Sequence, residues 1–218
     1  LNRSPIVFAG NSYLSSWCKQ FTENVHEVPT AVDLSKFKEK AKEPKHKFTV
    51  GWQGTSTSFK YLKNIEDELK EFFLTHSNCE LHVSSDRYPK ELTELHEYIE
   101  FKKWNKEDEV SHIQEFDVGI MPMEQDEYSL GKCSYKMLLY LSCGVPACVT
   151  SWGMNKEILK KGKVGIGVER ENKWNETLDY FYKNRFNLDE IFPDCRKVVK
   201  DFYSVESVVR KIENVLRT

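Results

Sequence analysis

Short apolar runs alternate with longer amphipathic segments through the body of the chain, and this pattern restricts the fold more than any other feature of the sequence. Apolar runs of strand length suit a buried parallel sheet, and the segments between them suit crossover helices. The pattern predicts an α/β fold, a Rossmann-like, doubly wound, parallel six-stranded sheet with helices on both faces. The predicted strands are residues 48–54, 79–85, 98–104, 116–123, 145–151 and 164–170.

Apolar residues recur at helical spacing between these strands. In residues 59–74, for example, Leu62, Leu69 and Phe72 follow a period of about 3.6 residues. The strand pattern stops after residue 171, and Ser204 is placed to cap the last of the helices that follow. The predicted helices are residues 59–74, 107–116, 134–143, 156–161, 172–183, 188–202 and 204–216.

Two changes of pattern divide the chain into three predicted parts. The first part is residues 1–46, and within it residues 1–34 hold a short apolar run, a helix-like stretch and an extended run. They lead into a basic stretch, 36–47, which has no apolar period and which we expect to be a solvated linker rather than a site for an anionic partner. Residues 47–171 form the predicted Rossmann-like domain, and residues 172–218 form C-terminal helices.

Charge and cysteine content exclude several classes of partner. The 32 Lys and Arg residues nearly balance the 34 Asp and Glu residues, so no bulk field holds nucleic acid or an anionic membrane. No apolar stretch approaches the roughly 18 to 20 residues of a membrane span, so we expect at most peripheral membrane association. The six cysteines form no CxxC pair, which predicts reduced thiols and a cytoplasmic location. Because the first residue is Leu, we expect a fragment or a processed chain.

Two loops are expected to meet where a ligand would bind. In an open doubly wound sheet, ligands bind beyond the carboxyl ends of the strands where the strand order reverses. If strand 48–54 lies beside strand 116–123, the loops GTSTS (54–58) and MEQDEYSLGK (123–132) meet there. The first loop, a glycine and four small hydroxyl residues that open into a helix, suits an oxyanion such as phosphate. A plain N-cap is the alternative for that loop.

The second loop adds positive charge next to a helix start. Lys132 precedes helix 134–143, and Lys136 follows four residues later on the same face. Exposed cations there oppose the macrodipole by about 0.3 to 1 kcal/mol each, so two of them suggest a bound anion, and a diphosphate fits two small-residue loops. Gly131 would let a phosphate approach the backbone. The alternative is local ion pairs with the acidic residues of the loop, Glu124, Asp126 and Glu127.

Several motifs are absent, which excludes other classes. The chain has no GxGxxG fingerprint, no GxxxxGK[ST] P-loop and no GxSxG elbow. A phospho-accepting receiver domain needs acidic residues after its first strand and an Asp after its third, where this chain has GTSTS and Asn105. The six histidines are scattered without metal-ligand spacing, so we expect no metal site.

Four segments in order carry a resemblance to a known family: VGWQGTSTSFKYL, IEFKKWN, FDVGIMPM and GKCSYKMLLYLSCGVPACVTSWGMNKEI. The chain resembles the C-terminal, nucleotide-sugar-binding domain of GT-B glycosyltransferases, specifically glycosyltransferase family 4, the group 1 transferases. The opening AGNSYLSSWCKQFTENVHEVPTAVDL looks like the passage from the acceptor domain into the donor domain. The resemblance covers almost the whole chain from Ile6 onward.

The resemblance implies roles for residues of the two loops. Gly54, Thr55 and Ser56 would face the donor diphosphate. Lys132 and Lys136 would neutralise the phosphates and stabilise the leaving nucleoside diphosphate. The implied donor is a nucleoside diphosphate sugar, and the resemblance implies no metal and no other cofactor.

Two further groups of residues match the walls of the family's cleft. Trp104 and Asn105 would lie where the family holds the nucleobase, largely through backbone groups. Gly153, Asn155 and Glu157 would line the far side of the cleft. Family 4 also commonly carries two glutamates eight positions apart, the second of which contacts the ribose; this chain has Gly131 and Leu139 there, so no such contact is implied.

The implied reaction is retaining transfer of a sugar to a saccharide or lipid-linked acceptor. An N-terminal domain before residue 1 would bind the acceptor, and helix 204–216 would cross back onto it, so we expect the apolar face of that helix to be partly uncovered and the isolated fragment to be inactive. A nucleotide-sugar epimerase of the same architecture is one alternative. A non-catalytic nucleotide-sugar-binding domain is the other.

Overall fold

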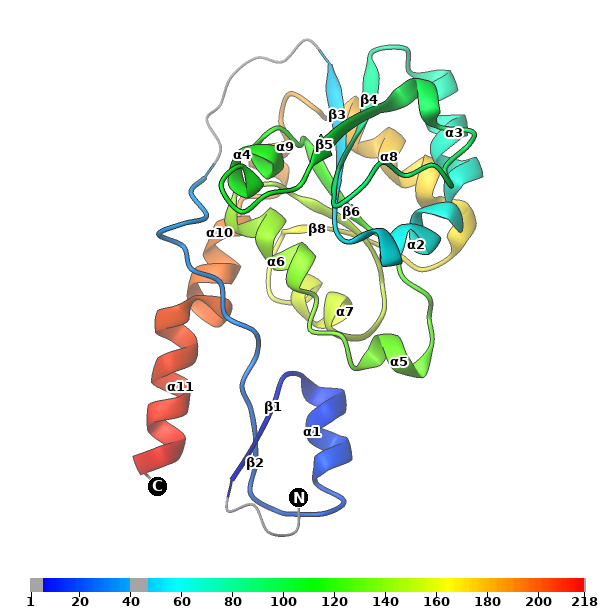
Figure 1. The fold of residues 1–218 in the computed structure, drawn as a ribbon. Helices are drawn as coiled ribbons and strands as arrows, with labels where there is room; N and C mark the ends of the chain where they lie inside the picture. Colours follow the sequence, from blue (N-terminus) through cyan, green and yellow to red (C-terminus); the bar gives the residue numbers. More distant parts are fainter. Residues whose placement is uncertain (1–5, 40–46, 218) are drawn as a thin grey trace.

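The six predicted strands form one parallel sheet in the computed structural model, which describes residues 6–39 and 47–217. The strand order is β5-β4-β3-β6-β7-β8, so the order reverses between β3 and β6 (Figure 1). The first predicted strand therefore lies beside the fourth, as expected. The strands are β3 (Phe48–Gln53), β4 (Cys79–Ser85), β5 (Ile99–Lys103), β6 (Val118–Met121), β7 (Ala147–Thr150) and β8 (Gly165–Val168).

Helices cover both faces of this sheet. On one face α3 (Glu66–Thr75) packs against α8 (Trp174–Lys183), and on the other α6 (Tyr135–Ser142) packs against α10 (Cys195–Val198) (Figure 1). Every residue of β3 is buried, because helices cover this central strand on both sides. The predicted doubly wound α/β sheet is confirmed.

The predicted helix 59–74 is divided into α2 (Phe59–Lys63) and α3. The N–H of Ile65 bonds to the carbonyl of Leu62 at 3.1 Å, three residues back rather than four, which tightens the chain between the two helices. Glu66 then opens α3 as a buried residue. Its carboxylate accepts a backbone N–H at 3.1 Å, a tertiary contact that the helical period alone does not predict.

Proline divides the predicted helix 188–202. The pieces are α9 (Leu188–Ile191), α10 and a π-helical turn (Val199–Tyr203). Pro193 lies between the first two pieces, and because proline has no N–H and its ring clashes with the preceding turn, a continuous helix cannot pass through it. The prediction of one helix here is wrong for that reason.

The residues before the main sheet form a small unit, called here the N-terminal unit. It consists of β1 (Val7–Ala9), α1 (Ser12–Cys18) and β2 (Val25–Glu27), and its two strands pair in parallel (Figure 1). The chain then enters the main core at Val32, which is 1% exposed, and Phe37, which is 3% exposed, belongs to the same core. The prediction of a solvated linker is therefore wrong at its start, and residues 40–46 of that stretch lie outside the described residues.

The last helix, α11 (Val205–Arg217), forms as predicted. Ser204 caps it, because its hydroxyl accepts the backbone N–H three residues later at 3.2 Å. Val208 is buried, whereas Val205 and Val209 are 40% and 44% exposed, so the apolar face is partly uncovered as expected. No helix within the described ranges is long and apolar enough to cross a membrane, and none of the six cysteines, all of which lie in those ranges, forms a disulfide.

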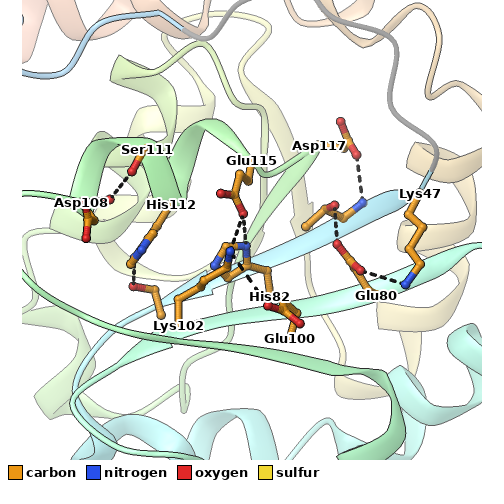
Figure 2. A network of polar contacts seen from close by, with 12 residues as sticks. Lys47, Glu80, His82, Glu100, Lys102, Asp108, Ser111, His112, Glu115 and Asp117 are labelled. Atoms are coloured by element: carbon orange, nitrogen blue, oxygen red, sulfur yellow. Dashed lines mark hydrogen bonds and ion pairs between the residues drawn. The ribbon is translucent and has the colours of Figure 1, made fainter.

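Charged side chains at the amino-terminal edge of the main sheet are paired within the protein (Figure 2). Lys47 Nζ lies 3.2 Å from a carboxylate oxygen of Glu80. The carboxylate of Asp117 accepts the N–H of Thr49 at 2.8 Å and so ties the start of β6 to β3. These contacts join the beginnings of three neighbouring strands.

The same network continues between β4 and the helix after β5, around two buried histidines (Figure 2). His82 Nδ1 lies 3.1 Å from Glu115 Oε2, and Lys102 Nζ lies 3.5 Å from the same oxygen. His112 Nδ1 lies 3.0 Å from Ser84 Oγ, and burial lowers the pKa of His112. These polar groups hold the helix against the sheet and are paired within the protein.

Candidate functional site

Lys132 lies at the carboxyl-terminal edge of the sheet and reaches across it to α2. Its Nζ donates a hydrogen bond of 2.8 Å to the hydroxyl of Tyr61. The same nitrogen lies 4.2 Å from the centre of the Tyr61 ring and 5.2 Å from that of Tyr128, within cation–π range. Gly131 precedes it with φ −74°, half-buried, at the end of a short helix. The ammonium group is thus held by aromatic side chains on two sides.

Lys136 lies in the first turn of α6 and shares this location. Its Nζ lies 4.3 Å from the centre of the Trp52 ring, at the end of β3. Burial and, to a smaller extent, the positive charge of Lys132 together lower the pKa of Lys136 to about 7. Gly54 makes room for this side chain, because a Cβ at position 54 would lie 2.3 Å from Lys136 Nζ and 2.8 Å from the Trp52 ring.

The acidic residues of the loop do not pair with these lysines. Glu124 lies 3.2 Å from Lys60 Nζ. Asp126 caps α5 (Glu127–Leu130), a helix that forms within the predicted loop because this carboxylate accepts a backbone N–H at 2.8 Å. Glu127 accepts a tyrosine hydroxyl of α1 at 2.7 Å. Neither lysine forms an ion pair with any side chain in residues 6–39 or 47–217, so the alternative of local ion pairs is wrong.

The GTSTS loop has its own internal partner. Asp86 accepts the N–H of Ser56 at 2.6 Å and its hydroxyl at 2.8 Å, and these hydrogen bonds lower the pKa of Asp86. The hydroxyls of Thr55 and Thr57 lie 2.8 Å apart. A carboxylate of the chain therefore occupies the oxyanion position that the sequence predicted for a phosphate. No side chain caps the 3-10 turn that begins here, so a plain N-cap does not describe the loop either.

Trp104 and Asn105 follow β5, two strands from β3. Trp104 is 42% exposed, and its Nε1 lies 3.4 Å from Glu109, the first residue of α4 (Glu109–Gln114). Glu109 also accepts the side-chain amide of Gln53 at 3.1 Å, which links this surface to the end of β3. Asn105 bonds to the backbone N–H of Asp108 at 2.7 Å and so shapes the turn before α4. At about 4.8 Å per strand, Trp104 lies roughly 10 Å from the β3 loop.

The residues expected on the far side of the cleft belong to α7 (Gly153–Leu159), which begins before the predicted 156–161. Gly153 has φ +50°, a conformation that favours glycine. Asn155 is fully buried and donates to a β7 carbonyl at 3.1 Å, so its side chain supports the strand end rather than facing a cleft. Glu157 accepts the hydroxyl of Ser12, which ties α7 to the N-terminal unit.

A separate cavity of about 190 Å³ lies at the ends of β6, β7 and β8. It shares Tyr61 with the lysine site and, apart from Met123 and Gln125 of the predicted loop 123–132, none of its lining residues belongs to the predicted site. The residues that line this cavity are Tyr61, Asn64, Ile65, Pro122, Met123, Gln125, Thr150, Val168, Glu169, Arg170 and Trp174.

Among the described residues, no group of three or more His, Cys, Asp or Glu side chains is arranged to hold a metal ion.

Four residues of the site were not found from the sequence: Trp52, Tyr61, Asp86 and Glu109. Trp52 and Tyr61 belong to apolar patterns that predict a core strand and a core helix, and both are in fact mostly buried. Asp86 and Glu109 are ordinary surface acids in sequence. Only the strand order brings Tyr61 to Lys132, from which it is separated by 71 positions.

Comparison with known families now decides the class of the protein. A family model described as glycosyl transferases group 1 matches residues 48–184, which is more than half of the chain. The chain belongs to the group 1 glycosyl transferases. The matched residues contain the whole six-stranded sheet and both lysines, so the family's common region includes the candidate site of this group 1 chain.

Solved structures share the fold of this group 1 chain. TarM superposes with a TM-score of 0.78 at 15% identity, over 100% of this chain and 44% of TarM. HepE from Anabaena superposes with a TM-score of 0.77 at 13% identity, over 99% of this chain and 63% of HepE. The C-terminal domain of a group 1 family protein from Francisella tularensis, LpcC, gives a TM-score of 0.61 at 15% identity, over 80% of this chain and 100% of that domain.

These lengths define what the similarity covers. The chain spans 44% of TarM and 63% of HepE, and it extends beyond the isolated C-terminal domain of LpcC. A search of curated protein sequences returned no match. The fold is therefore that of a GT-B glycosyltransferase C-terminal domain, in a group 1 chain.

Proposed function

We propose that the chain is the donor-binding part of a retaining glycosyltransferase, of family 4, that transfers a sugar from a nucleoside diphosphate sugar to a saccharide or lipid-linked acceptor. One observation carries the proposal. Two half-buried lysines lie at the point where the strand order of the sheet reverses, and neither has a carboxylate partner within residues 6–39 and 47–217. Partly desolvated positive charge without an anionic partner is costly, so an anion of the ligand is the natural partner.

The chemistry of sugar transfer gives these lysines a use. When the bond between the anomeric carbon and the phosphate oxygen breaks, negative charge develops on the nucleoside diphosphate. Lys132 is fixed by Tyr61 and points its ammonium group at this place, and Lys136, with a pKa of about 7, takes up a proton when a phosphate approaches. Positioned positive charge in a partly closed site stabilises such a leaving group. In this proposal the lysines supply that charge and no metal takes part.

The positions of the other residues extend the same model. Trp104 lies roughly 10 Å from the β3 loop, a distance that suits a nucleobase joined through ribose to a diphosphate. Gly54 acts by leaving space for Lys136 rather than by holding a phosphate itself. Ser56 is hydrogen-bonded to Asp86 and Asn155 is buried, so neither residue is assigned a direct contact with the ligand.

Ligands of the structural relatives suggest the first probe. HepE has been solved with UDP and glucose and with UDP-glucose, and a TarM variant from S. aureus with fondaparinux, α-GlcNAc-glycerol and UDP. For this chain, UDP is the first nucleotide to test and GDP the second.

Calorimetric titration tests the proposal. The protein should bind UDP or GDP in the presence of EDTA, and Lys132→Ala should weaken that binding about ten- to a hundredfold, the effect of losing a hydrogen bond to a charged group. Lys160→Ala, which removes an exposed lysine at the end of α7, is the matched control and should bind like the wild type. Equal affinities for wild type and Lys132→Ala would contradict the assignment.

A further inference from the structure

Asn11 of the N-terminal unit bonds directly to the loop that carries Lys132. Its Nδ2 donates to the carbonyl of Leu130 at 2.9 Å and to the carbonyl of Lys132 itself at 3.1 Å. Its Oδ1 accepts the N–H of Leu14 at 2.9 Å and so caps α1. Asn11 is 4% exposed, so these bonds are shielded from water.

Both N–H donors and the carbonyl oxygen of the Asn11 side chain have a partner in these three bonds. A carboxamide has two N–H donors and a carbonyl acceptor, and each donor here meets a different backbone carbonyl. Aspartate and serine at this position could still accept the α1 bond, but aspartate has no donor and serine has only one hydroxyl for both tasks. The geometry therefore requires an amide at position 11 and not only a helix cap.

The loop that Asn11 holds is strained at its other end. Ser134, two residues after Lys132, has φ +50° and ψ +30°, a left-handed conformation that is unfavourable for serine. Its Oγ is buried and has no hydrogen-bond partner within the described residues. Strain of this kind persists only where surrounding contacts fix the backbone. The two bonds from Asn11 are such contacts.

Other residues of the N-terminal unit contact the loop around Lys132. A Cβ at Gly10 would lie 2.6 Å from Cys133 Sγ, so the backbone at position 10 is packed directly against the loop. The hydroxyl of Tyr13 donates to Glu127 at 2.7 Å, at the start of the helix before the loop. The unit thus contacts the loop before, at and after Lys132.

We propose that Asn11 is a positioning residue for Lys132: it fixes the backbone of residues 130–132 so that the ammonium group reaches the Tyr61 hydroxyl and the phosphate position beside it. This inference rests on the proposed function. Asn11 acts through Lys132 and touches no ligand. The N-terminal unit therefore contributes to donor binding through its contact with this loop.

Calorimetry with UDP and GDP tests this role with two variants of Asn11. Asn11→Asp keeps the cap of α1 and removes both donors, and Asn11→Ser keeps a cap without adding a negative charge near the phosphates. Each should weaken binding about tenfold, the effect of losing two buried hydrogen bonds that align the lysine. Asn184→Asp is the matched control, since it removes an amide bond to a carbonyl of α8, and it should bind like the wild type.

A double-mutant cycle separates positioning from general stability. If Asn11 acts through Lys132, Asn11→Ser should lower the affinity for UDP or GDP about tenfold in the wild type and should leave it almost unchanged in the Lys132→Ala background. Unchanged binding by both Asn11 variants, or equal losses in both backgrounds, overturns the positioning role while leaving the proposed function intact. Failure of the wild type to bind either nucleotide overturns the proposed function, and the positioning role with it.

Discussion

At the amino-terminal edge of the main sheet, Lys47 lies 3.2 Å from Glu80, and the carboxylate of Asp117 accepts the backbone N–H of Thr49 at 2.8 Å. At the carboxyl-terminal edge, Lys132 and Lys136 meet a tyrosine hydroxyl and aromatic rings instead of carboxylates. The same sheet therefore pairs its charges at one edge, whereas at the other edge two lysines have no ion-pair partner among the described residues. Departures from local compensation concentrate at functional sites, and this one lies where the strand order reverses.

The carboxyl-terminal edge itself contains both behaviours. In the loop after β3, the backbone N–H and the hydroxyl of Ser56 both donate hydrogen bonds to the carboxylate of Asp86. Lys132 and Lys136, in the loop before α6 and in its first turn, form no ion pair with an acidic side chain of the described residues. The difference shows that the lysines, and not the small hydroxyl residues, are the part of this edge that remains open to an anion. The following variants test that difference.

Among the three variants that follow, Gly54→Ala should have the largest effect on nucleotide affinity. A Cβ at this position would lie 2.3 Å from Lys136 Nζ and 2.8 Å from the Trp52 ring, so the ammonium group must leave its place. We expect the affinity for UDP or GDP to fall about tenfold, which corresponds to about 1.4 kcal/mol. In a Lys136→Ala background, Gly54→Ala should cause little further loss of nucleotide affinity. A tenfold loss in both backgrounds would show that the glycine acts through the loop and not through the lysine.

Lys136→Met should change stability in a way that depends on pH. Below pH 7 the folded and unfolded chains both carry the proton, so the folded state bears the full cost of a buried ammonium group. Between pH 7 and the ordinary lysine pKa, the folded chain releases this proton while the unfolded chain keeps it, and wild-type stability rises. The variant should therefore melt about 4 °C higher than the wild type at pH 6, with the gap closing toward pH 10.

Thermal melts at pH 6 and pH 10 measure this difference. Lys160→Met, which changes an exposed lysine at the end of α7, should show no such trend. A constant gap between Lys136→Met and the wild type across this range would mean that Lys136 keeps an ordinary pKa.

Asp86→Ala should have the smallest effect on binding. If the β3 loop is satisfied within the protein, removing its partner should change nucleotide affinity by less than about twofold, that is, by less than 0.5 kcal/mol. Because the pKa of Asp86 is lowered, its contribution to stability is present above the ordinary aspartate pKa and is lost as the pH falls through the folded value. A tenfold gain in affinity would show instead that Ser56 binds phosphate and competes with Asp86.

The strands were predictable because they obey a local rule. The four inner strands, β4, β3, β6 and β7, are short runs that are almost entirely buried, the edge strands β5 and β8 are partly exposed, and all six formed close to the predicted bounds. The helices were less predictable where tertiary contacts intervene. The break before Glu66 depends on a backbone N–H from a distant loop, and α5 depends on a cap by Asp126 that competes with ion pairing. Pro193 was a local signal for a break, but the helical period of residues 188–202 led to the prediction of a single helix.

For the site, the sequence supplied the two lysines and their position relative to a helix start, because charge against a helix dipole is visible in the order of residues. It did not supply their surroundings. Trp52, Tyr61 and Gly54 act on the lysines across gaps of many positions, and a period of apolar residues does not distinguish an aromatic ring in a core from one beneath an ammonium group.

By itself, the sequence determined the parallel α/β sheet, the resemblance to group 1 transferases and the presence of two cations near one loop. These follow from periodicity and from short motifs, which are local properties of the chain. Only the tertiary structure decided which charges are compensated, that Asp86 takes the donors of the β3 loop, and that Asn11 holds the backbone of Lys132. Such pairings join residues 30 to 121 positions apart, and packing rather than sequence spacing brings them together.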